Sequence, residues 1–139
     1  MAVVVYRRPF LHPIHAVLLA GAFPLFLGAL LSDLAYAASY EIQWKNFASW
    51  LIVGGLIFGG FAGLWALVAL ARRDRARWSV LYVLLLLAAW IIGFVNALIH
   101  AKDAWASMPE STILSAVVVV LTLGAIAFGF SAGREREPL

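Results

Sequence analysis

Apolar residues along this chain gather into four long runs, which short polar segments separate. A helix needs about 20 apolar residues to cross the hydrocarbon core of a bilayer, and each run is close to that length or longer. The pattern predicts four membrane-spanning helices, at residues 14–34, 47–71, 78–99 and 113–130. Because the connections are short, helices adjacent in sequence are expected to pack antiparallel.

This pattern predicts an all-α fold, an integral membrane four-helix bundle, with residues 1–139 forming a single transmembrane domain. The composition agrees, since 65% of the 139 residues are hydrophobic and 12% are charged. A soluble domain is nearer half apolar and a quarter charged. The lipid bilayer is therefore the expected partner of the outer helix faces.

Basic residues are concentrated on one side of the predicted membrane. Eight lie on that side, namely Arg7, Arg8, Arg72, Arg73, Arg75, Arg77, Arg134 and Arg136. The other side has only Lys45 and Lys102. The positive-inside rule then places both termini and the loop between the second and third runs in the cytoplasm. The same rule explains the net charge of +3 without a nucleic-acid partner.

Aromatic residues near the ends of the runs are expected to form belts at the two membrane surfaces. The outer belt is predicted to contain Tyr36, Tyr40, Trp44, Trp50 and Trp105, and the inner belt Tyr6, Trp78 and Tyr82.

The N-terminal segment invites a different interpretation, because Arg7-Arg8-Pro9-Phe10-Leu11 looks like a twin-arginine export signal. The segment Ala35-Tyr36-Ala37-Ala38, rich in small residues, would then supply a cleavage site. The apolar core of a secretory signal is about 7–15 residues long, whereas the run at 14–34 is longer and ends in Asp33. We expect this first helix to be retained, with the arginines anchoring it; a role for Arg7 and Arg8 in targeting stays open.

Small residues recur every four positions in the second run, at Gly55, Gly59 and Gly63. This spacing lets helix backbones approach closely. It favours packing within one bundle; a seam between copies of the chain and the close approach of a flat cofactor are the alternatives.

Polar side chains inside membrane helices are costly and mark candidate functional sites. His15 and Asp33 are 18 residues apart, about five helical turns, so both lie on one face, which is expected to point into the bundle. Asn96 and His100 are one turn apart in the third run. Because Asp33 ends the first helix on the same side of the membrane, an outer polar cluster of Asp33, Asn96 and His100 is predicted.

The outer cluster has two interpretations. It is either a hydrogen-bond network that fixes the helix ends, or a site for a ligand, a metal or a proton. A carboxylate and one histidine supply two ligands with no third, so a closed zinc site is not expected.

The sequence "LHPIH" predicts the start of the first helix on the inner side. Pro13 suits the first helical turn, with His12 near the cap and His15 pointing inward. Histidines at a membrane boundary either anchor and cap the helix or hold haem b or a quinone headgroup. His100 is predicted at the opposite surface, so it does not share a haem with His15.

Two segments, "LHPIHAVLLAGAFPLFLGALLSDLAY" and "HAKDAWASMPESTILSAVVVVL", resemble a bacterial membrane family known as domain of unknown function 2231. The residues that carry the resemblance are His12, Pro13, His15, Asp33, His100, Asp103, Ala104 and Trp105. The resemblance covers about residues 12–129 and implies a four-helix inner-membrane protein. Some members are joined to Rieske-type iron–sulfur domains, which suggests electron transfer. Relatives often end in a Tyr-Arg-His-Gly type of tail, whereas "FSAGREREPL" has no histidine, which weakens the haem interpretation.

Enzymatic activity is not expected, because the chain contains no cysteine and no phosphate-binding or hydrolase motif. The first interpretation is a small polytopic inner-membrane protein, a structural, interaction or complex subunit that forms a homo-oligomer or joins a partner membrane subunit. The alternatives are a redox module that binds haem or quinone near His12 and His15, and a small ion or proton transporter using Asp33 and His100.

Overall fold

The computed structural model describes residues 12–72 and 79–131, which form four helices in this part of the chain. The helices are α1 (Pro13–Ser39), α2 (Ile42–Ala71), α3 (Ser79–His100) and α4 (Glu110–Ser131). Each is long and apolar enough to cross a membrane, which confirms the predicted all-helical membrane bundle. The predicted anchors and belt residues that lie outside the described residues are Tyr6, Arg7, Arg8, Arg73, Arg75, Arg77, Trp78, Arg134 and Arg136.

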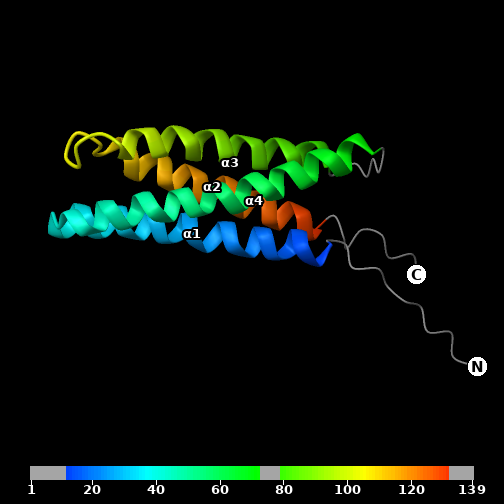
Figure 1. Cartoon of the computed structure of the whole chain (residues 1–139), viewed down its shortest axis with the longest axis horizontal. Coiled ribbons are helices and arrows are strands. Elements are labelled where there is room, and N and C mark those ends of the chain that lie inside the picture. The colour runs from blue at the N-terminus through cyan, green and yellow to red at the C-terminus, as the bar shows by residue number, and fades with distance from the viewer. Residues whose placement is uncertain (1–11, 73–78, 132–139) are drawn as a thin grey trace, which may run out of the picture.

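The four helices lie side by side with alternating directions (Figure 1). α1 and α3 each pack against both α2 and α4, so the helices form a closed ring in which every neighbour is antiparallel. We call the end where α1 begins and α2 ends the proximal end. The distal end contains the turn between α1 and α2 and the connection from α3 to α4.

The two ends of α1 have identifiable stop and start signals. His12 caps the helix, its Nδ1 accepting a hydrogen bond from the backbone N–H of Ile14 at 3.3 Å, and Pro13 occupies the first turn as predicted. At the distal end, Tyr40 adopts a left-handed conformation with φ of 58°. Its N–H donates to the carbonyl of Tyr36, and α2 begins two residues later. Both α1 and α2 therefore extend beyond their predicted apolar runs.

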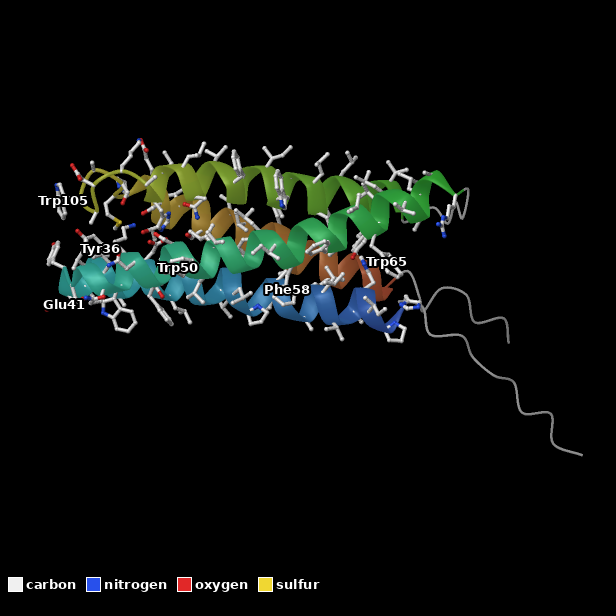
Figure 2. The ribbon with its side chains drawn as sticks, viewed as in Figure 1. Tyr36, Glu41, Trp50, Phe58, Trp65 and Trp105 are labelled. Carbon is white, nitrogen blue, oxygen red and sulfur yellow. The ribbon has the colours of Figure 1, made fainter. Side chains whose placement is uncertain are left out.

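The buried face of α1 follows the predicted helical period. His15, Leu19, Phe26 and Asp33 all lie on it, together with the small residues between them. The bundle interior is therefore polar near both ends and apolar in the middle. Large apolar side chains cover the outer surface, among them Trp50, which is 76% exposed. Figure 2 shows Trp105 at the distal end and Trp65 at the proximal end.

Glycines make room for large side chains rather than for a neighbouring backbone. A Cβ added to Gly55 would lie 2.6 Å from the ring of Phe26, which also approaches Gly59 and Gly93. Gly63 has open space where its Cβ would be. The close packing predicted at every fourth residue of α2 is therefore interrupted at Gly63. At Gly55 and Gly59, the absence of a side chain makes room for the ring of Phe26.

Candidate functional site

The distal end contains a buried polar network centred on Asp33 of α1. Asp33 is completely buried. Its Oδ1 accepts hydrogen bonds from Lys45 Nζ of α2 and from His100 Nε2 of α3, each at 2.9 Å. Its Oδ2 accepts from Ser115 Oγ of α4 at 2.6 Å. One carboxylate is therefore bonded to a side chain from each of the other three helices.

Lys45 is the counter-charge of Asp33. It lies in the first turn of α2 and is 5% exposed. Its ammonium also donates to Ser111 Oγ at 2.5 Å, and it lies 5.5 Å from the ring centroid of Tyr36, within the range of a cation–π interaction. Burial of an unpaired ammonium would be very unfavourable, so the carboxylate, hydroxyl and ring together make this position tolerable.

His100 faces an acceptor at each ring nitrogen. Nδ1 lies 2.9 Å from the backbone carbonyl of Asn96, and Nε2 lies 2.9 Å from Asp33 Oδ1. A carbonyl and an ionised carboxylate can only accept hydrogen bonds. The ring satisfies both contacts only when both nitrogens carry a proton, and a neutral ring satisfies one of them.

Asn96 extends the network toward the middle of the bundle. Its Nδ2 donates to Ser115 Oγ at 2.9 Å, which in turn donates to Asp33. Its Oδ1 is buried and has no hydrogen-bond partner among the described residues. The structure thus brings Asp33, Asn96 and His100 together at one end, and Asn96 reaches Asp33 through a serine hydroxyl.

Three members of this network were not found by sequence reasoning. They are Lys45, Ser111 and Ser115, and together with Asp33, Asn96 and His100 they make up what we call the Asp33 cluster. The sequence places Lys45 outside the membrane, because the predicted apolar run begins at residue 47. The spacing of Ser111 and Ser115, four residues apart at the start of α4, places both on one helix face and is the signal that could have identified them.

The cluster has the chemistry of an anchor built on the paired charges of Asp33 and Lys45, and of a proton-binding site at His100. Opposite charges close together compensate each other strongly where water is scarce. A metal site is less well supported, because the described residues contain no group of three or more His, Asp or Glu side chains suited to hold an ion. The carboxylate oxygens of Asp33 are already occupied by nitrogen and hydroxyl donors.

The histidines of the proximal end lie around Trp65 of α2. The ring centroid of His12 is 5.0 Å from that of Trp65, and the centroid of His15 is 6.4 Å from it. His15 is buried, and its Nε2 lies 2.6 Å from the hydroxyl of Tyr82 on α3. His15 Nδ1 is buried without a hydrogen-bond partner in the described part of the chain. Neither proximal histidine is near the Asp33 cluster.

The contacts of His15 and His100 do not favour these two residues as haem ligands. An axial ligand needs a ring nitrogen free to bond iron, whereas His15 Nε2 contacts Tyr82 and both nitrogens of His100 are bonded. His15 Nδ1 is free of partners among the described residues but is enclosed by protein. His12 is exposed, and its Nδ1 caps α1.

Two tyrosines predicted for the aromatic belts lie inside the bundle instead. Tyr36 is 5% exposed and Tyr82 is 1% exposed. Each contacts a buried charged or titratable side chain, Lys45 and His15 respectively, which explains the inward orientation. Tyr40, Trp44, Trp50 and Trp105 are exposed, as belt residues are expected to be.

Comparison with known proteins identifies one relationship. Neither the curated proteins nor the solved structures contain a significant match to this chain. A family model described as "Predicted membrane protein (DUF2231)" matches residues 11–135. The match includes both polar ends of the bundle and all four helices. The chain therefore belongs to the DUF2231 family of predicted membrane proteins.

Proposed function

We propose that the protein is a non-enzymatic structural or interaction subunit of a bacterial cytoplasmic membrane, with residues 1–139 forming a single transmembrane domain. The observation that carries this proposal is that Asp33 is bonded to a residue from each of the other three helices. The carboxylate of Asp33 thus holds the four helices to one another. A cluster used in this way acts as an internal support and leaves the outer surface to mediate association.

The physical argument rests on the way charge is handled in a low-dielectric interior. A buried ion pair adds little net stability compared with apolar packing, but removing one partner leaves an uncompensated charge and is strongly destabilising. The three contacts of Asp33 are made together only when all four helices meet in one register. The Asp33 cluster therefore favours this arrangement over other packings of four similar apolar helices.

The outer surface supports a role in association. Large apolar side chains remain exposed on it, including Phe47, Trp50 and Phe61 of α2. Lipid covers such a surface in a monomer, and a second copy or a partner membrane subunit covers part of it in an assembly. We propose that the protein works as a homo-oligomer or with such a partner.

The proposed orientation has both termini in the cytoplasm, as the distribution of arginines indicates. Because the chain contains no cysteine, single-cysteine variants can test it without background labelling. Glu41→Cys marks the distal end and Ala71→Cys the proximal end; both positions are exposed. A membrane-impermeant maleimide applied to spheroplasts should label only Glu41→Cys, and the reverse pattern would contradict the proposal.

The functional proposal is tested by comparing the wild-type protein with Asp33→Asn in two measurements. Thermal unfolding in mild detergent reports on the bundle, and native mass spectrometry reports on the assembly. We expect Asp33→Asn to lower the unfolding temperature and to dissociate the assembly, while Glu110→Gln, an exposed charge of the distal end, changes neither. An unchanged bundle and assembly in Asp33→Asn would refute a structural role for the cluster.

A second candidate function is proton binding or transfer, which the two acceptor contacts of His100 favour. The ring gains or loses one hydrogen bond with each proton, in contact with a carboxylate that also accepts from the Lys45 ammonium. A transmembrane path is less well supported, because Leu19, Ala22, Phe26 and Ala29 occupy the α1 face between His15 and Asp33. Proton flux in liposomes that Asp33→Asn or His100→Ala abolishes, without a change in unfolding temperature, would replace the first proposal by this one.

A further inference from the structure

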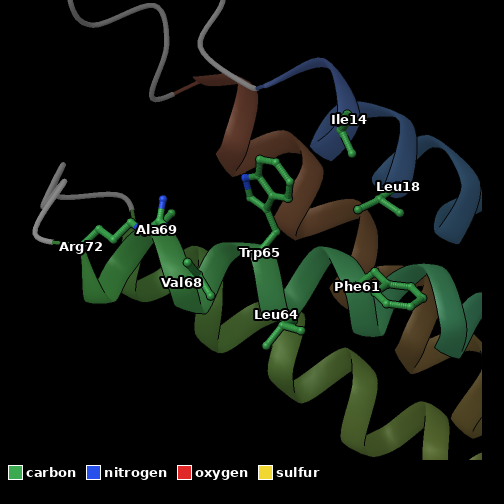
Figure 3. Close-up of a pocket in the computed structure, with 8 residues that line it drawn as sticks. All are labelled: Ile14, Leu18, Phe61, Leu64, Trp65, Val68, Ala69 and Arg72. Carbon is green, nitrogen blue, oxygen red and sulfur yellow. The ribbon is translucent and has the colours of Figure 1, made fainter.

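A groove lies on the outer surface between α1 and α2 at the proximal end (Figure 3). Its volume is about 680 Å³, and it is lined by Ile14, Leu18, Phe61, Leu64, Trp65, Val68, Ala69 and Arg72. We call it the α1–α2 groove. Ile14, Phe61 and Leu64 are each more than half exposed, so the groove opens to the side of the bundle, toward the surrounding lipid. The Asp33 cluster lies at the opposite end.

The lining has the distribution expected for an amphiphile. Seven of the eight lining side chains are hydrophobic or aromatic, and the eighth, Arg72, is a cation. A volume of several hundred Å³ is typical of small-molecule sites, and an apolar groove with one charged residue suits a molecule with a hydrocarbon tail and an anionic head. Arg72 follows directly after the last residue of α2, and Figure 3 shows it beyond Ala69 at one end of the groove.

Arg72 determines the sign of the charge that the groove attracts. α1 begins at this end and α2 ends there, so their helix dipoles oppose each other. A guanidinium offers a planar set of donors that matches two phosphate oxygens. The next residues in the sequence include Arg73, Arg75 and Arg77, and a run of basic residues beside a membrane attracts anionic lipids.

Trp65 is placed as a residue at the membrane–water boundary. It lies seven positions before Arg72, two helical turns or about 10 Å along the helix axis. Tryptophan concentrates at the level of the lipid headgroups, and this one forms part of the groove lining next to His12. The positions of Trp65 and Arg72 are therefore those expected of a groove that runs from the apolar layer into the headgroup layer.

We propose that the α1–α2 groove binds an anionic phospholipid, with an acyl chain along Phe61 and Leu64 and the phosphate at Arg72. The proposal does not depend on the Asp33 cluster or on the function proposed above. The lipid would fill the open side of the α1–α2 pair at the proximal end.

Native mass spectrometry of the full chain, purified and exchanged into phosphatidylglycerol or phosphatidylcholine, tests the proposal. Ala69→Trp fills the groove from an exposed position, and Ala127→Trp is its control on the exposed surface of α4. Arg72→Gln removes the cation, and Lys102→Gln is its control at the distal end. Thermal unfolding of each variant verifies that the bundle is intact.

We expect the wild-type protein to retain phosphatidylglycerol in preference to phosphatidylcholine. Ala69→Trp should lose both lipids, Arg72→Gln should lose the preference, and both controls should match the wild type. Equal retention of the two lipids by the wild-type protein, or undiminished retention by Ala69→Trp, would overturn the proposal. A preference that survives in Arg72→Gln would overturn the assignment of the phosphate to this residue.

A photoreactive amino acid in place of Leu64 identifies the occupant directly in intact membranes. Cross-linking to phosphatidylglycerol supports the proposal. Cross-linking to a quinone, to a second copy or to another segment of this chain would overturn it, because each of these is a different occupant of the same groove.

Discussion

The carboxylate of Asp33 and the ammonium of Lys45 lie 2.9 Å apart inside the bundle, on two helices that a tight turn connects. The pair is separated by twelve positions in the sequence. His100 and Ser115 complete the contacts of the carboxylate from the two remaining helices. The Asp33–Lys45 ion pair therefore depends on α1 and α2 alone, whereas the hydrogen bonds of the Asp33 carboxylate depend on all four helices.

A double-mutant cycle on this pair should show strong coupling. Asp33→Asn leaves a buried ammonium and Lys45→Met leaves a buried carboxylate, so each should lower the free energy of unfolding by about 3–5 kcal/mol. The double variant should lose less than the sum, because neither charge remains. Unfolding in detergent measures each corner of the cycle; additive losses would contradict a direct ion pair.

The exposed pair of Lys102 and Glu110 provides the matched comparison. Their side chains are 48% and 60% exposed, and the N–O distance is 3.3 Å. Exposed pairs contribute about 1 kcal/mol or less, so Lys102→Met and Glu110→Gln should each have a small effect.

When the His100 ring makes both observed contacts, nitrogen NMR should show a hydrogen-bonded N–H group at Nδ1 and another at Nε2. In Asp33→Asn the acceptor at Nε2 changes from a carboxylate to an amide, so the Nε2 resonance should move more than the Nδ1 resonance. Equal shifts at the two nitrogens would indicate that the ring leaves its position instead.

Tyr82→Phe should lower stability by about 1 kcal/mol, the typical net contribution of one hydrogen bond. The hydroxyl of Tyr82 lies 2.6 Å from His15 Nε2, and the substitution keeps the ring while removing that contact. Thermal unfolding and the His15 ring resonances report the change. Identical His15 resonances in the two proteins would rule out this hydrogen bond.

Two glycines of α2 should respond in opposite ways to the same substitution. In Gly55→Ala the new methyl group meets the ring of Phe26, which Gly59 and Gly93 enclose on other sides. Overpacking of this kind costs about 1–3 kcal/mol. Gly63→Ala has open space, so it should be neutral or stabilising through helix propensity. Equal effects of the two variants on unfolding would contradict the ring packing described here.

Helical periodicity was sufficient to predict the inward face of α1, because His15 and Asp33 repeat in phase with the helix. It could not place Lys45, whose burial follows from the tight turn at Tyr40 and from the early start of α2. The contact between His15 and Tyr82 was also beyond sequence reasoning. It depends on the relative register of α1 and α3, and a tyrosine near a helix end is equally typical of a membrane surface.

The tight turn at Tyr40 has a consequence for membrane insertion. Because α1 and α2 are adjacent in the sequence and carry both members of the ion pair, the hairpin contains its own counter-charge. The hairpin can enter the bilayer with its buried carboxylate and ammonium already paired, before α3 and α4 have been synthesised. The later helices then supply His100, Ser111 and Ser115 to a charge pair that is already formed, so the order of the helices in the chain matches an order of assembly in which Asp33 and Lys45 are never buried apart.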